Sequence, residues 1–192
     1  MRGFSMLEVL VTLALVVLVS AIALPIGERM RQEGRVRGAA YALAARCGYL
    51  RMASVHRNAR VAMRLRQEGD RWIAQTFVDG DWDGVLSADI ASGRDPAIDA
   101  PVDVRQWLGG AELGFAPGCP LVDGTTVPSG ASPVRIGSSR LLVFTPDGAS
   151  SGGSLYVRGA PGTASYAVVV LGATGRTRLM RCPPGGGAWA QQ

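Results

Sequence analysis

Aspartates occupy alternate positions in the segment Asp79-Gly80-Asp81-Trp82-Asp83-Gly84. Carboxylates at positions 1, 3 and 5 with a glycine at position 6 match the first half of a calcium-binding loop, because glycine lets the backbone reverse around one cation. The second half fits less well, since Ile90 occupies position 12 and the nearest acid, Asp89, comes one residue early. The expected Ca²⁺ ligands are therefore Asp79, Asp81, Asp83 and Asp89, and the alternative is a solvated acidic turn.

A second candidate site is the segment Gly175-Arg176-Thr177-Arg178 near the C-terminus. Glycine permits a turn with positive φ, and in a strand Arg176 and Arg178 would point to one face, about 6.6 Å apart along the chain. Two guanidinium groups at that spacing, with Arg181 nearby, could bind adjacent phosphates. The alternative is a solvated hairpin whose charged residues protect a sheet edge.

Other reactive side chains are few. All 20 cationic side chains are Arg, which excludes Schiff-base and P-loop lysine mechanisms. The single His56 and three Cys without a C-x-x-C pair provide too few well-spaced ligands for a His/Cys zinc site. Residues 148–152 match G-x-S-x-G, but a strand-like run follows where a nucleophile elbow requires a helix. We therefore expect a turn there and a protein that is not an enzyme.

The elements that position these residues begin with an apolar run. Residues 4–24, closed by Pro25, would form a helix of about 32 Å, which is long enough to span a membrane. A secretory signal peptide ending at residues 21–23 is the alternative. Glu8 lies inside this run, and a membrane-embedded carboxylate normally has a partner. Cleavage after Gly3 would provide one, because in parallel helices the new ammonium of Phe4 could pair with Glu8 of a neighbouring subunit.

Beyond the apolar run, the pattern indicates an α+β domain. Residues 26–58 continue the helix in amphipathic form, with Ala39, Leu43, Leu50 and Ala53 at helical spacing among arginines. Alternating residues then predict a hairpin over 61–78, and further strands at 140–145, 154–158, 166–172 and 176–181. Residues 79–138 form an irregular region, and residues 183–192 a mobile tail. The expected architecture is a long helix packed on an antiparallel sheet.

Both ends of the chain resemble one family. The segment Gly3-Phe4-Ser5-Met6-Leu7-Glu8 before an apolar run resembles the prepilin signal of type IV pilins and type II secretion pseudopilins, although that family usually has Thr and Leu in place of Ser5 and Met6. The C-terminal segments resemble the GspH/FimT family of minor pilins and pseudopilins. They comprise residues 144–148, 166–171 and 175–178, followed by Cys182.

This resemblance implies a pilin-like fold and a defined processing route. Prepilin peptidase would remove leader residues 1–3 and methylate Phe4, residues 4–25 would stay in the inner membrane, and Glu8 would act in assembly with other pilins or pseudopilins. The N-terminus would be cytoplasmic, and residues 59–182 would form a periplasmic domain. In the FimT-like branch a G-R-x-R motif binds double-stranded DNA, and Gly175, Arg176 and Arg178 match it.

An exported domain also permits a disulfide. A bridge between Cys119 and Cys182 would attach the irregular region to the last strand, whereas Cys47, on the helix, suits a small buried apolar residue. Three function hypotheses follow: a minor pilin or pseudopilin that binds DNA, a purely structural type II secretion pseudopilin, and a calcium-dependent adhesin carried on a pilus.

Overall fold

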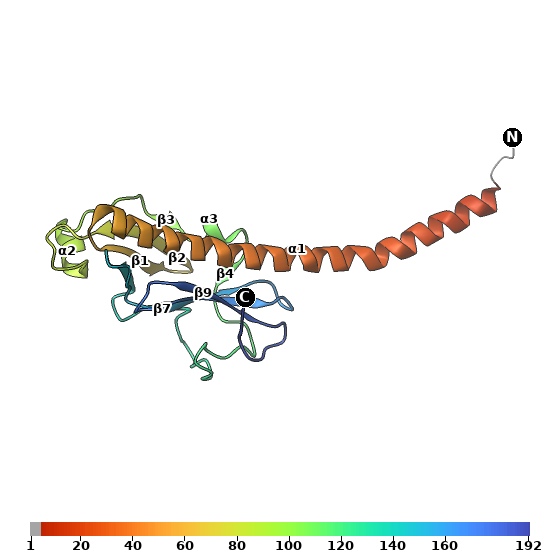
Figure 1. Ribbon diagram of the computed structural model, residues 1–192. Coiled ribbons are helices and arrows are strands. Elements are labelled where there is room, and N and C mark those ends of the chain that lie inside the picture. The colour runs from red at the N-terminus through yellow and green to blue at the C-terminus, as the bar shows by residue number, and fades with distance from the viewer. Residues whose placement is uncertain (1–4) are drawn as a thin grey trace.

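The computed structural model describes residues 5–192, and its longest element is the helix α1 (Met6–Arg57). Pro25 lies inside α1 without ending it, and the N-terminal half projects beyond the rest of the molecule (Figure 1). The helix ends at Asn58, which adopts a left-handed conformation with φ 49° and donates its backbone N–H to the carbonyls of Ser54 and Val55. A single helix therefore joins the apolar and the amphipathic segments, as the sequence predicts.

The first sheet lies against the C-terminal half of α1. Strands β1 (Val61–Glu68) and β2 (Arg71–Val78) form the expected antiparallel hairpin, in which Val61 pairs with Val78 and Glu68 with Arg71. Gly69 occupies the turn with φ 59°, a conformation that glycine adopts without steric cost. The short β3 (Val102–Asp103) and β6 (Leu141–Phe144) flank this hairpin, so the strand order is β3-β2-β1-β6.

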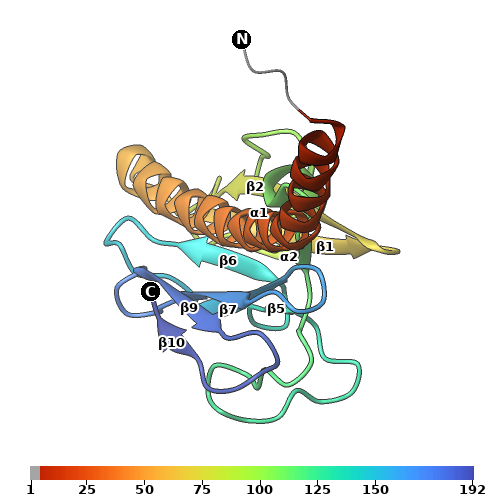
Figure 2. The same ribbon diagram turned by 90° about the vertical axis from the view of Figure 1, so that its right-hand side faces the viewer.

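The second sheet has the order β10-β9-β8-β7-β4, and β5 also pairs with β7. Its central strands β7, β8 and β9 correspond to three of the predicted strands, and Figure 2 shows β6, β7 and β9 beneath α1. The irregular region contributes the small helices α2 (Ser87–Ser92) and α3 (Arg105–Leu108) and the two-residue strands β4 and β5. The bounds are β4 (Glu112–Leu113), β5 (Val134–Arg135), β7 (Gly153–Arg158), β8 (Ser165–Val170), β9 (Thr177–Cys182) and β10 (Ala190–Gln191).

One hydrophobic core joins α1 to both sheets. Leu43 and Leu50 of α1, Met63 of β1 and Val168 of β8 belong to it, and each is at most 1% exposed. Along β8 the side chains alternate, so that Tyr166, Val168 and Val170 face α1 while Ala167 joins a smaller cluster on the opposite face. The buried residues of α1 are Val36, Ala39, Ala40, Leu43, Cys47, Leu50 and Ser54.

Polar contacts also fix α1 on the first sheet. Arg46 donates a hydrogen bond to the Thr76 hydroxyl at 2.9 Å and forms an ion pair with Asp99. Its guanidinium also lies over the rings of Tyr49 and Trp107, at 5.0 and 5.4 Å from their centroids. Since Asp99 in turn accepts the backbone N–H of Thr76 at 2.7 Å, one network connects helix, strand and loop.

The C-terminal segment differs from the expected mobile tail. Residues 183–192 return along the domain, and β10 pairs with β9. Trp189 packs edge-on against Tyr156 and donates its indole N–H to the Pro120 carbonyl at 2.8 Å. The expected disulfide between Cys119 and Cys182 is present, with Cα atoms 6.2 Å apart. The glycine-rich composition suggested mobility, but the disulfide and this aromatic contact hold the segment in place.

The architecture is thus α+β, with a long helix that packs on antiparallel sheets through its C-terminal half only. The predicted strands are present with shifts of one or two residues at their ends. The glycine-rich segment Gly148-Ala149-Ser150-Ser151-Gly152 forms the expected connection between strands, in which Ser150 donates its backbone N–H to the Gly172 carbonyl.

Candidate functional site

The segment of α1 from Met6 to Ile26 has no buried residue. Its large apolar side chains are exposed throughout, from Met6 at 81% to Ile26 at 55%. Within residues 5–192, α1 is the one helix that is long and apolar enough to span a membrane. A helix that is apolar on all sides is typical of a membrane span or of the interior of a bundle. This segment therefore requires an apolar environment that the chain itself does not supply.

Glu8 is the only acid in that exposed segment. It lies in the first turn of α1 and forms no ion pair within residues 5–192. Gly3 and Phe4, the expected cleavage site and the expected partner ammonium, lie outside the described residues. A carboxylate in an apolar helix is costly without a partner, so Glu8 remains the clearest candidate for a contact between subunits.

A second exposed face runs along the packed half of α1, and the sequence analysis missed it. At 100° per residue it lies opposite the buried face. We call it the small-residue face, because its members are small or apolar residues. Arg37 borders it. They are spaced three or four residues apart and are all exposed: Gly27, Met30, Gly34, Gly38, Tyr41, Ala45, Gly48, Met52 and Val55.

The glycines on this small-residue face have no role in packing within the chain. A Cβ added at Gly27, Gly34, Gly38 or Gly48 would meet no atom within 4 Å. Each glycine inside a helix costs about 0.5–1 kcal/mol relative to alanine. Four of them on one exposed face permit close approach by another backbone, as small residues do between membrane helices. Their spacing was the signal in the sequence that could have revealed this face.

In the segment Gly175-Arg176-Thr177-Arg178, both arginines remain accessible to a ligand. Arg176 and Arg178 are exposed and form no ion pair within residues 5–192. Arg178 lies in β9 opposite Val169, whereas Arg176 precedes the strand and accepts the backbone N–H of Leu171 through its carbonyl. Because this turn packs near Arg51 of α1, it lies well away from the projecting half of the helix.

Gly175 has a structural role in this turn. It is buried with φ 58°, and a Cβ added there would lie 2.4 Å from the Gly148 carbonyl oxygen. Arg51 closes the contact by donating a hydrogen bond from Nε to the same oxygen at 3.3 Å. The glycine therefore allows two turns to meet close to Arg51 of α1.

Arg181 does not join the other two arginines. It lies an odd number of residues from Arg178 along β9, so its side chain emerges on the opposite face of the sheet. There it donates a hydrogen bond to Glu33 of α1 at 2.7 Å, and this contact is the main cause that raises the pKa of Arg181. The expectation that Arg181 belongs to a phosphate-binding group is therefore corrected: it connects the sheet to the helix.

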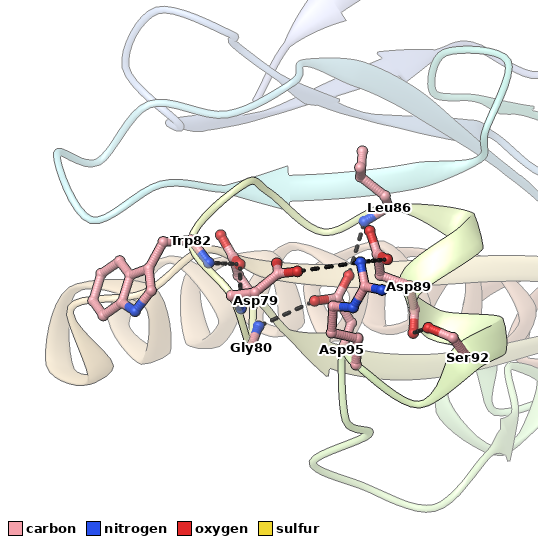
Figure 3. Close-up of polar contacts among 9 residues, drawn as sticks. Asp79, Gly80, Trp82, Leu86, Asp89, Ser92 and Asp95 are labelled. Atoms are coloured by element: carbon pink, nitrogen blue, oxygen red, sulfur yellow. Dashed lines mark hydrogen bonds and ion pairs between the residues drawn. The ribbon is translucent and has the colours of Figure 1, made fainter.

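The aspartate loop brings three of its four expected ligands together. Oxygen atoms of Asp79, Asp81 and Asp83 all lie within 4.8 Å of one another. A hydrogen bond with Asp81 is the main cause that raises the pKa of the exposed Asp83, and slight desolvation and the neighbouring carboxylates raise it further. Asp79 also accepts the backbone N–H of Trp82 at 2.7 Å, which holds that exposed residue at φ 72° (Figure 3).

Asp89, the fourth expected ligand, is directed elsewhere. Its side chain is nearly buried and forms an ion pair with Arg94 at 2.8 Å, and Arg94 also lies 3.5 Å from Asp81 (Figure 3). Buried Asp95 closes the loop by accepting the backbone N–H groups of Gly80 and Leu86 at 3.0 and 2.9 Å. The expected set of four calcium ligands is corrected in one member: Asp79, Asp81 and Asp83 lie together, whereas Asp89 is paired with Arg94. Calcium binding by the three grouped carboxylates stays a prediction, in a loop that Arg94 and Asp95 brace.

No protein-family model, no curated protein and no solved structure matches this chain.

Proposed function

We propose that this chain is a membrane-anchored minor pilin or type II secretion pseudopilin of the GspH/FimT type, which assembles through α1. In this proposal residues 4–25 anchor the subunit in the inner membrane until it enters a filament. Neighbouring α1 helices then cover the exposed apolar segment and the small-residue face, and Glu8 pairs with the Phe4 ammonium of a neighbour. The globular domain remains on the outside of the filament.

The small-residue face is the observation that carries the proposal. A membrane anchor alone accounts for the exposed apolar side chains between Met6 and Ile26, but it does not account for glycines as far along α1 as Gly48. That position lies about 33 Å beyond Ile26 along the helix axis, outside any bilayer. A helical partner accounts for both regions, because it would follow the same side of α1 from the membrane into the filament.

The test exploits the open space around these glycines. In the double variant Gly34→Leu, Gly38→Leu, the added Cβ atoms meet no atom within 4 Å, and helix propensity rises, so thermal stability should not fall. In cells that carry the matching filament genes, the variant should disappear from the sheared filament fraction. The single variant Ala42→Leu, at an exposed position beside the small-residue face, is the control and should still assemble. Normal incorporation of the double variant would contradict the proposal.

A DNA-binding role is the second candidate, favoured by the exposed and unpaired guanidinium groups of Arg176 and Arg178. Phosphate neutralisation releases counterions, so the logarithm of the affinity for double-stranded DNA should fall by about 0.9 per contact for each unit of log salt. The double variant Arg176→Ala, Arg178→Ala of the full chain in detergent should lose binding and reduce that slope. Arg66→Ala with Arg71→Ala removes the same charge from the β1–β2 hairpin and is the control.

Equal binding by the Arg176, Arg178 variant and its control would leave the structural pseudopilin as the better account. A Gly175 variant would be uninformative here, since its Cβ would collide with the Gly148 carbonyl and disturb the fold.

A further inference from the structure

Four arginines follow the exposed apolar segment of α1 within three turns of helix. Arg29, Arg31, Arg35 and Arg37 are all exposed, and the first buried residue of the helix is Val36. Glu28 and Glu33 are the acids of this stretch. The region between the apolar segment and the globular domain is therefore a short, strongly cationic length of helix.

The rise of the helix places these arginines relative to a bilayer. If the apolar segment ends at Ile26, Arg29 lies about 5 Å and Arg35 about 14 Å beyond it along the axis. The polar headgroup layer extends about 5–7 Å from the hydrocarbon core. Side chains on a helix lean toward its N-terminus, which for α1 is the direction of the membrane. The guanidinium groups of Arg29 and Arg31 thus reach the headgroup layer, and that of Arg35 extends toward it.

The two nearby acids are already engaged. Glu28 forms an ion pair with Arg31, and Glu33 accepts the hydrogen bond from Arg181. Arg29 and Arg35, in contrast, form no ion pair with any residue from 5 to 192. Glu33 is thus paired with Arg181 and forms no ion pair with Arg29 or Arg35.

The two free arginines lie on different sides of the helix. At 100° per residue, Arg29 lies on the side that the sheets cover from Val36 onward, whereas Arg35 lies 100° from Val36 and 60° from Gly38 of the small-residue face. Arg29 therefore lies between the globular domain and the membrane, and Arg35 lies at the edge of the small-residue face.

We propose that Arg29 and Arg35 bind the phosphate groups of anionic phospholipids in the leaflet from which α1 emerges, and so hold the globular domain close to the membrane before assembly. This inference rests on the membrane anchoring in the proposed function, but it concerns headgroup chemistry rather than filament contacts. Its physical basis is that one arginine near an anionic surface changes membrane partition about fivefold.

The experiment uses the full chain reconstituted in phosphatidylcholine vesicles with a trace of spin-labelled phosphatidylglycerol or spin-labelled phosphatidylcholine. Electron paramagnetic resonance then measures the fraction of each labelled lipid immobilised by the protein. We expect a roughly twofold to fivefold preference for phosphatidylglycerol, which decreases as salt screens the charges. The variant Arg29→Gln, Arg35→Gln should bring the ratio to one, whereas Arg29→Lys, Arg35→Lys should retain a preference.

The control variant is Arg57→Gln, Arg60→Gln, which removes two exposed arginines at the far end of α1. It should leave the preference unchanged, and an equal loss in this variant would overturn the assignment to Arg29 and Arg35. Immobilised lipid without any headgroup preference would overturn the lipid proposal while the membrane anchor stands. A chain that immobilises no lipid and is released by alkaline extraction would overturn the anchor and the lipid proposal together.

Discussion

The two halves of α1 belong to one continuous helix, yet they have opposite surroundings. Leu13 in the N-terminal half is 56% exposed, whereas Leu43 in the C-terminal half is 1% exposed. The first half is apolar on every side, and the second half concentrates its buried residues on one face. The sheets can cover only that one face, so the rest of the apolar surface requires a membrane or other subunits. Only the C-terminal half of the longest helix contributes to the folded core, and the N-terminal half leaves its apolar side chains exposed.

Removing the carboxylate from the exposed half should have the largest effect on assembly. We expect Glu8→Ala to abolish recovery in the sheared filament fraction, because the variant cannot neutralise a neighbouring ammonium in an apolar environment. Its thermal midpoint should equal that of the wild type, since Glu8 contacts no part of the domain. Thr12→Ala is the control, because the Thr12 hydroxyl bonds only to the Val9 carbonyl of its own helix. Normal incorporation of the Glu8→Ala variant into filaments would contradict the proposed pairing of Glu8 with a neighbouring Phe4 ammonium.

A matched pair of leucine truncations tests the contrast in stability directly. Leu43→Ala should lower the free energy of unfolding by about 2–5 kcal/mol, because it leaves a cavity in the core shared by α1 and both sheets. Leu13→Ala should leave the free energy of unfolding unchanged. Chemical denaturation of both variants, followed by near-ultraviolet circular dichroism, provides the measurement. Similar losses in the two variants would mean that the N-terminal half also packs within the chain.

The boundary between the two halves is marked by the contact between Glu33 and Arg181. Arg181→Ala should cost about 0.5–1 kcal/mol, because both side chains are partly exposed and solvent screens the pair. Amide hydrogen exchange should accelerate in the turn of α1 around Glu33 and Val36 and stay unchanged around Leu50. Arg158→Ala, which removes a comparably exposed pair with Glu112, is the control and should leave exchange in α1 unaltered.

The smallest effect concerns the free thiol in the packed half. Burial is the largest cause that raises the pKa of Cys47 to about 12, so the thiol stays protonated up to strongly alkaline pH. At pH 8 the folded chain should give no reaction with a thiol reagent, while the chain unfolded without reductant should give one thiol. Rapid labelling of the folded chain would show that the packed half of α1 separates readily from the sheets.

Most of the regular elements could be predicted from the sequence because their signals are local. Helical spacing of Ala39, Leu43 and Leu50 reports one buried face, and alternation along residues 61–78 reports a hairpin. The small-residue face is an equally local feature, but apolar spacing does not reveal it because four of its positions are glycine. Its positions are as regular as those of the core.

The candidate sites were predicted less well, since their chemistry depends on distant partners. Arg181 and Glu33 are 148 positions apart, and nothing near either residue indicates the other. Asp89 lies one residue before the last ligand position of a calcium loop, and the group that it contacts is Arg94. A charged side chain pairs with the group that the fold places beside it. The sequence pattern alone therefore could not assign a role to Arg181 or Asp89.

The sequence by itself determined the apolar helix, the course of the strands and the cysteines available for a bridge, because near neighbours in the chain impose periodicity and turn chemistry. Only the tertiary structure decided which arginines remain free, that the C-terminal segment pairs with β9, and that one side of α1 stays uncovered. These features depend on contacts between segments far apart in sequence, whose geometry exists only after the sheets have packed on the helix.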